Sequence, residues 1–160
     1  MSRIPFAIFF SLIEMANSSP LHAVVFRIGE VTCALPAGIV REILPRLPAT
    51  RIPGAAGAVE GLVNVRGALV TVLDGHPLLN QLRREDDEGA IVLLDVGLRR
   101  YGLSVGQVLD FLELPGGTVA ERRDLPGVDP RLVNGVGVHR DRHFILLNVE
   151  ALFAPLVDGS

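Results

Sequence analysis

Two histidines four residues apart form the most metal-like motif of the sequence, in the run His139-Arg140-Asp141-Arg142-His143. On an α-helix, histidines at positions i and i+4 share one face and can bind the same zinc ion. Here strand-like apolar patterns flank the motif on both sides, and its two arginines would repel a cation. We therefore expect a charged hairpin turn at residues 139–143 and no metal site.

Nucleophiles and carboxylates also lack the partners that catalysis requires. Cys33 lies in an apolar strand pattern with no histidine suggested beside it, and we expect a buried structural thiol. Ser104 has glycines at the spacing of G-x-S-x-G, in the run 102–106, but it lies within a predicted strand and not at the strand-to-helix turn that makes this motif a nucleophile. Asp74 and Asp95 have no carboxylate at a useful spacing. The phosphate-binding motifs G-x-x-x-x-G-K-[ST] and G-x-G-x-x-G are absent from the sequence. The sequence therefore predicts neither an enzyme nor a cofactor.

The composition predicts one globular unit rich in short strands. Hydrophobic residues make up 49% of the 160 residues and charged residues 21%, which is enough apolar material for a core and too little charge for a disordered chain. The 17 glycines and 11 prolines are scattered, as short strands with frequent turns require. The net charge of −3, without a basic stripe, excludes a nucleic-acid surface. The single cysteine excludes an internal disulfide.

The first residues resemble a short signal peptide. Arg3 precedes an apolar run at 4–13, which is too short to span a bilayer, since that takes about 20 residues. Residues 14–18 offer no clean small-x-small cleavage site. We expect translation to start at Met15, with export as the alternative, and residues 1–21 to be a leader that is disordered or not translated. We expect no direct insertion into a membrane.

The sequence contains an internal repeat, which predicts two similar lobes. Residues 25–44 match 93–112 at an offset of 68, and residues 61–79 match 135–153 at an offset of 74. Among the aligned pairs are Gly29 with Gly97, Glu42 with Asp110, Arg66 with Arg140, and Asp74 with Asn148. We place the lobes at 22–82 and 90–156.

Periodicity and turn residues predict the elements of each lobe. In the first lobe we expect strands at 24–28, 31–35, 62–65 and 69–73, helices at 37–44 and 77–82, and an extended loop held by Pro45, Pro48 and Pro53. In the second we expect strands at 91–96, 100–105, 133–138 and 144–147, a short helix or strand at 107–114, a polar crossover at 120–130 and a helix at 149–153. We expect the charged residues 83–88 to form a solvated seam between the lobes. The fold class is mostly β, as two small barrels packed together with short helices.

One strand presents a mixed face. Alternation along residues 62–66 places Val63 and Val65 on the core side and Leu62, Asn64 and Arg66 on the other. An apolar residue beside an amide and an arginine suits a protein contact. An ordinary solvated strand face explains the same pattern, and the residues alone leave both interpretations open.

The same residues resemble the CheW family of chemotaxis coupling proteins. Residues 24–30 resemble the opening strand and turn of that family, and residues 39–43 its V-x-E-I helix. The most specific element is 61–67, GLVNVRG, close to G-x-x-N-L-R-G and preceded by Arg51-Ile52-Pro53. Residues 135–137 and 145–152 resemble the closing strand and helix. The match extends from about His22 to Leu156.

The resemblance implies two five-stranded SH3-like barrels, no catalysis and no cofactor. It also implies a cytoplasmic adaptor that bridges the cytoplasmic tips of chemoreceptors to the regulatory domain of a CheA-type histidine kinase. Five positions match the partner-binding or nearby supporting residues of the family: Val40, Glu42, Gly61, Asn64 and Arg66.

Two departures from the family pattern leave a second function open. Residues 70–76, VTVLDGH, stand where the family has V-P-V-x-D-L-R, and residues 105–108, VGQV, lack the aspartate of V-D-x-V. The alternative is a CheW-like regulatory module of twitching motility or another signalling pathway, which binds a different protein or a small ligand.

Overall fold

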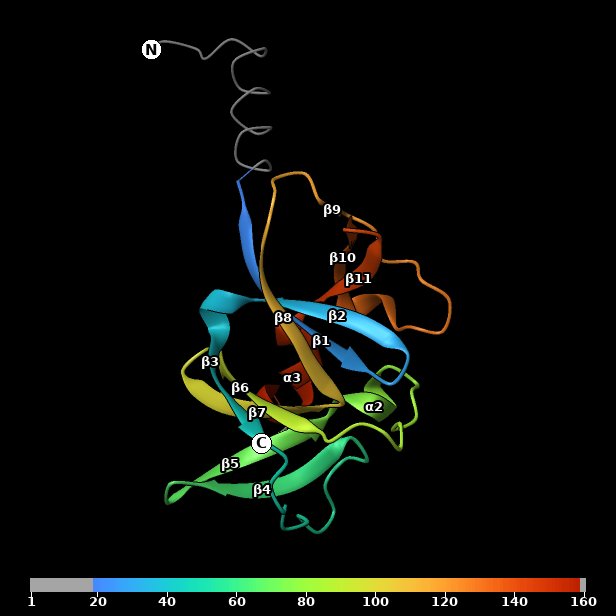
Figure 1. Ribbon diagram of the computed structural model, residues 1–160. Coiled ribbons are helices and arrows are strands. Elements are labelled where there is room, and N and C mark those ends of the chain that lie inside the picture. The colour runs from blue at the N-terminus through green and yellow to red at the C-terminus, as the bar shows by residue number, and fades with distance from the viewer. Residues whose placement is uncertain (1–18, 159–160) are drawn as a thin grey trace, which may run out of the picture.

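The computed structural model describes residues 19–158, which form two β-sheets with short helices between and beside them (Figure 1). The six-stranded sheet has the order β8-β1-β2-β11-β10-β9, and the five-stranded sheet has the order β3-β6-β7-β5-β4. The six-stranded sheet contains β1 (Leu21–Ile28), β2 (Val31–Pro36), β8 (Gln107–Leu114), β9 (Val119–Ala120), β10 (Val133–His139) and β11 (Arg142–Leu147). The five-stranded sheet contains β3 (Val40–Pro45), β4 (Val59–Val65), β5 (Ala68–Asp74), β6 (Ala90–Val96) and β7 (Arg99–Val105).

The helices are few and short. They are the 3-10 turns η1 (Ala37–Ile39) and η2 (Pro130–Leu132), and the α-helices α2 (Gly75–Leu78) and α3 (Val149–Asp158). None of the helices in the described range is long and apolar enough to cross a membrane. The predicted mostly β fold with two lobes and short helices is confirmed.

The predicted leader is wrong at its last residue, because β1 already begins at Leu21, which lies opposite Leu114 of β8. The predictions about Met15 and the residues before it lie outside the described residues.

Apart from β9, the two sheets repeat one another strand by strand, at the offsets expected from the sequence. The order β3-β6-β7-β5-β4 corresponds to β8-β1-β2-β11-β10, with one parallel pair in each sheet. In the five-stranded sheet Val72 lies opposite Gly102. Moved by 74 and by −68 residues, these positions become Leu146 and Ala34, which lie opposite one another in the six-stranded sheet. The predicted repeat is therefore present in the strand register.

The boundaries of the lobes differ from those predicted. The hairpin β1–β2 from the first half of the chain pairs with β10–β11 from the second half, through the parallel pair β2–β11. The hairpins β4–β5 and β6–β7 make the reciprocal pairing through β5–β7. Each sheet thus takes strands from both halves, so the ranges 22–82 and 90–156 do not describe the lobes. The hydrophobic pattern of a strand identifies its buried face, but does not identify its neighbour.

The predicted helix at 37–44, and with it the helix expected for residues 39–43, is wrong. After the single 3-10 turn η1 the chain continues as β3, which pairs with β6 in antiparallel register from Val40 to Pro45. Val40 and Ile43 still pack against the main core, as their spacing suggested, but they do so from a strand. Pairing with β6 satisfies the backbone groups that a short helix would leave without partners. The ambiguous segment 107–114 is the strand β8, the repeat counterpart of β3.

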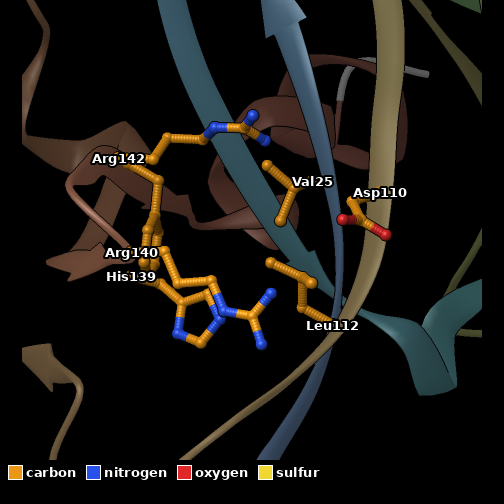
Figure 2. A pocket seen from close by; sticks show the side chains of 7 residues that line it. Val25, Asp110, Leu112, His139, Arg140 and Arg142 are labelled. Atoms are coloured by element: carbon orange, nitrogen blue, oxygen red, sulfur yellow. The ribbon is translucent and has the colours of Figure 1, made fainter.

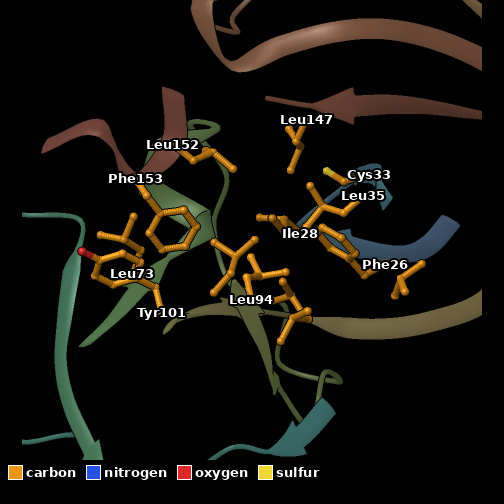
Figure 3. Close-up of a cluster of buried hydrophobic side chains, with 14 of the residues drawn as sticks. Phe26, Ile28, Cys33, Leu35, Leu73, Leu94, Tyr101, Leu147, Leu152 and Phe153 are labelled. Atoms are coloured by element: carbon orange, nitrogen blue, oxygen red, sulfur yellow. The ribbon is translucent and has the colours of Figure 1, made fainter. Parts of the chain in front are cut away.

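The main core lies between the two sheets and includes α3 (Figure 3). Phe26 and Leu35 enter it from the six-stranded sheet, Leu94 from the five-stranded sheet and Phe153 from α3. All four residues are completely buried. The ring of Phe153 stacks on Tyr101 of β7 with 5.3 Å between centroids. The last helix is therefore part of the packing that joins the lobes.

Cys33 is a structural thiol, as predicted. It is completely buried in the main core, and this burial raises the pKa of the thiol well above its ordinary value. A thiol that stays protonated is a poor nucleophile, so Cys33 contributes apolar volume rather than reactivity.

The charged seam at residues 83–88 is only partly solvated. Asp87 is 5% exposed and forms an ion pair with Arg27 of β1. Arg83 donates hydrogen bonds to Asp74 at 2.9 Å and to Glu60 at 2.7 Å. The predicted solvated seam is therefore wrong for Asp87, which is buried beside Arg27, whereas Arg83 stays exposed while it pairs with Asp74 and Glu60.

Candidate partner-binding surface

Arg66 and Glu42, two of the five predicted site residues, form an exposed ion pair. The two guanidinium nitrogens of Arg66 donate to the two carboxylate oxygens of Glu42 at 3.0 and 2.5 Å. Their side chains are 67% and 36% exposed. Hydrogen bonds from Arg66 hold the pKa of Glu42 below its ordinary value, so the carboxylate stays ionised at neutral pH. A two-point contact of this kind fixes the plane of the guanidinium at the protein surface.

The turn that carries Arg66 is held by Asn64. Arg66 and Gly67 have φ values of 51° and 87° and join β4 to β5 as a two-residue turn. The side-chain oxygen of Asn64 accepts the backbone N–H of Gly67 at 2.8 Å. Alternation along β4 therefore stops at Val65, and Arg66 is exposed because of the turn rather than because of the strand. Asn64 supports the turn while its side chain lies at the surface.

Gly61 allows another segment to approach β4. Its φ is 143°, and a Cβ placed on it would lie 2.3 Å from the carbonyl oxygen of Thr50. Thr50 and Leu62 exchange two backbone hydrogen bonds of 2.8 Å at this point. Gly61 is therefore required for the loop 46–58 to close on β4. Val40 is also placed for support, since it is half-buried against the main core.

The ion pair belongs to a larger charged patch that sequence analysis did not find. Asp95 of β6 accepts hydrogen bonds from Arg41 of β3 and from Arg100 of β7, the latter at 3.4 Å. Arg100 also lowers the pKa of Glu42 through its charge, after the larger effect of the hydrogen bond from Arg66. Sheet pairing brings Arg41 to this patch, because β3 is distant in sequence from the β6–β7 hairpin and pairs with β6 in the sheet.

An open groove lies beside the patch on the five-stranded sheet. Its volume is about 570 Å³, and Arg66 and Arg100 stand at its rim. Leu69, opposite Asn64 in the β4–β5 hairpin, is 67% exposed and lines it. The remaining lining residues are Val65, Ala68, Val70, Thr71, Leu93, Arg99 and Tyr101. Apolar and aromatic residues flanked by arginine are typical of protein contacts.

The histidine motif forms the turn that the sequence predicted. β10 ends at His139, Arg140 and Asp141 make the turn, and β11 begins at Arg142. Val138 lies opposite His143, so the two histidines belong to neighbouring strands rather than to one helical face. Within residues 19–158 no cluster of three His, Cys, Asp or Glu side chains is placed to hold a metal ion.

A buried histidine–carboxylate pair has the geometry, but not the neighbours, of an acid–base dyad. Asp74 accepts the backbone N–H of His76 at 3.0 Å and lies 2.7 Å from its ring Nδ1. Burial raises the pKa of Asp74, but hydrogen bonds from His76 and Arg83 outweigh it and lower the pKa below its ordinary value. The other ring nitrogen of His76 is buried without a partner in the described part of the chain. A nucleophile bonded to that nitrogen is what hydrolytic chemistry would require.

We expect Asp74→Asn to lower the free energy of unfolding by about 1.5 kcal/mol at pH 7, because one charge-assisted contact to Arg83 is lost. The pKa of Asp74 is lower in the folded state than in the unfolded state. The ionised carboxylate therefore contributes fully to the free energy of unfolding at any pH above its unfolded-state pKa, and this contribution is lost as the pH falls through its folded-state pKa. The difference between variant and wild type should therefore shrink below about pH 4. Urea titrations at several pH values measure it, with Asp86→Asn at an exposed pair as control. A difference that grows in acid would contradict the assignment.

Comparison with known proteins identifies relatives over most of the chain. The model of the CheW-like domain family matches residues 22–156. The probable chemotaxis protein CheW of Rhizobium etli is 26% identical over 145 residues, covering 89% of this chain and 93% of the relative. Protein PilI of Pseudomonas aeruginosa is 31% identical over 134 residues, covering 79% of this chain and 72% of the relative.

A solved structure has the same fold. The scaffolding protein TtCheW of Thermoanaerobacter tengcongensis superposes with a TM-score of 0.75 at 22% sequence identity, covering 81% of this chain and 90% of that protein. At this identity the likeness concerns the fold, which consists of the two lobes described above.

Proposed function

This chain belongs to the CheW family of chemotaxis coupling proteins, and from that premise we propose that it is a non-catalytic adaptor that couples chemoreceptors to a CheA-type histidine kinase. The observation that carries the proposal is the exposed Arg66–Glu42 pair, which stands at the most family-specific motif of the chain. In this proposal the chain binds the regulatory domain of the kinase and the cytoplasmic tip of the receptor, and it acts in the cytoplasm at receptor arrays.

The chemistry of the surface supports binding rather than catalysis. Arg66 is held in place by Glu42 before a partner arrives, so less conformational freedom is lost on binding. The adjacent groove offers exposed apolar area at Leu69. We propose that Arg66, Glu42 and the groove contact the partner, whereas Gly61, Asn64 and Val40 hold the strand and turn that present them.

A second candidate is supported by the 31% identity with Protein PilI. In that case the chain is a CheW-like module of a twitching-motility pathway, with the same contact surface and a different receptor and kinase. The departures at residues 70–76 and 105–108 favour this candidate as well.

Reconstitution tests the proposal and separates the candidates. The purified full chain is mixed with the regulatory domain of a CheA-type kinase and with a receptor cytoplasmic fragment, each taken from the chemotaxis and from the pilus system of the same genome. We expect a ternary complex on size-exclusion chromatography, which forms with only one of the two sets. Binding to neither kinase would overturn the proposal, and binding to the pilus set alone would establish the second candidate.

A further inference from the structure

The internal repeat gives the Arg66–Glu42 pair a counterpart in the six-stranded sheet. The offset of 74 carries Arg66, in the β4–β5 turn, onto Arg140 in the β10–β11 turn. The offset of 68 carries Glu42 on β3 onto Asp110 on β8. The register agrees, because Glu42 and Asp110 lie opposite residues that are themselves 68 apart in the chain. Arg140 and Asp110 therefore occupy the positions of an ion pair.

In contrast to Arg66 and Glu42, the residues Arg140 and Asp110 do not form an ion pair with each other. Arg66 donates to both oxygens of Glu42, whereas no ion pair joins Arg140 or Arg142 to a carboxylate within residues 19–158. Arg140 and Asp110 instead line a cavity of about 180 Å³, and Figure 2 shows both arginines reaching from the hairpin toward the strands that carry Val25 and Asp110. Val25, Leu112 and Phe144 give the cavity an apolar floor, and His139 completes it.

Two local features keep the pair apart. The side chain of Asp110 is one methylene shorter than that of Glu42, and one of its oxygens already accepts the backbone N–H of Phe111 at 2.8 Å. The β10–β11 turn has φ values of 49° at Arg140 and 64° at Asp141, and so lacks the glycine that its counterpart has at Gly67. Left-handed backbone at two non-glycine residues is strained, and such strain is concentrated at ligand sites.

We propose that this cavity binds a free α-amino acid with an apolar side chain. A carboxylate fits between the unpaired guanidinium groups of Arg140 and Arg142, which are the natural donors for a two-point contact. An ammonium group fits the free oxygen of Asp110, and the apolar floor accepts the side chain. The ligand thus links Arg140 to Asp110, with its carboxylate at the arginine and its ammonium group at the aspartate. In the five-stranded sheet the corresponding residues, Arg66 and Glu42, contact each other directly.

The size of the cavity suits a ligand of this class. An apolar cavity of about 150 Å³ holds a benzene molecule, so about 180 Å³ leaves room for a small branched amino acid. The cavity is open to solvent, as a site for a diffusible ligand must be. Opposite charges on facing walls select a zwitterion, because a simple anion would face Asp110 and a simple cation would face the arginines.

Calorimetric titration of the full chain with L-valine tests the proposal, beside N-acetyl-L-valine and L-valinamide. The first analogue removes the positive charge and the second removes the carboxylate. We expect valine to bind with a millimolar or lower dissociation constant, and each analogue to bind at least about tenfold more weakly. Arg140→Ala should weaken valine binding by a similar factor, whereas Arg131→Ala, at an exposed ion pair elsewhere, should not change it.

Asp110→Glu is the sharper variant, because it recreates the residue of the five-stranded sheet. The longer side chain should reach Arg140, close the cavity and abolish valine binding, while the melting temperature is maintained or rises. The proposal would be overturned if valine did not bind the wild type, if either analogue bound as tightly as valine, or if Arg140→Ala or Asp110→Glu bound valine like the wild type. None of these outcomes depends on the proposed adaptor function, which concerns the other sheet.

Discussion

Gly61→Ala is expected to lower the free energy of unfolding by about 3 kcal/mol, or about 10 °C in melting temperature. Two effects combine at this residue. The φ of 143° is a conformation that side chains other than glycine rarely adopt, and the new Cβ would lie 2.3 Å from the carbonyl oxygen of Thr50. That atom belongs to the backbone and is held by the hydrogen bonds between Thr50 and Leu62, so it cannot simply turn away.

A matched glycine separates the two effects. Gly54 also has a positive φ, of 77°, but an added Cβ would meet no atom within 4 Å. Gly54→Ala should therefore cost about 1 kcal/mol, from backbone strain alone. Thermal melts of both variants provide the comparison. If Gly61→Ala melts like the wild type and still loses its partners, then Gly61 is a contact residue and its assigned role in closing the loop is wrong.

The sequence was informative wherever local pattern and spacing decide the structure. The offsets of 68 and 74 were visible in glycine and apolar positions, and the strand register follows them. The hairpin at 139–143 was predictable because alternating apolar residues flank a polar turn. Burial of Cys33 followed from its apolar neighbours on the same strand.

The errors have one physical cause, which is pairing between distant strands. Residues 40–45 have apolar spacing compatible with a helix, and only the free edge of β6 makes them a strand. The lobes exchange hairpins because β2 pairs with β11 and β5 with β7, which no local pattern encodes. Asp87 is buried because Arg27 faces it from a strand 60 residues earlier in the chain.

The same cause limited the prediction of the site. The motif at 61–67 identified Arg66 as a site residue, and the family resemblance identified Glu42. Their contact was not predictable, because the two residues are 24 positions apart in the chain and belong to β3 and to the turn after β4, at opposite edges in the strand order of one sheet. Asp95 was set aside for want of a carboxylate neighbour, whereas its partners in the structure are the arginines Arg41 and Arg100. Sequence thus identified residues of the surface without identifying how they are held.

Arg66→Ala should weaken binding of the kinase regulatory domain or the receptor fragment by about tenfold or more. Arginine is over-represented among residues that dominate interfaces, and this one is exposed, fixed by two hydrogen bonds and adjacent to an apolar groove. The melting temperature should change by only a few degrees, because the pair with Glu42 lies in solvent, where ion pairs contribute little to stability.

Three further variants decide whether Arg66 acts by contact or by structure. Arg66→Lys keeps the charge but loses the planar fork, and we expect it to recover little of the binding. Glu42→Gln keeps the shape but releases the guanidinium, and we expect a smaller loss than for Arg66→Ala, since the arginine remains available without being pre-organised. Arg131→Ala removes an exposed, ion-paired arginine from the turn η2, away from the five-stranded sheet, and should bind like the wild type. Titrations beside thermal melts measure all four variants. If Arg66→Ala lowers the melting temperature strongly while each folded molecule still binds normally, Arg66 stabilises the hairpin and the partner contacts another face.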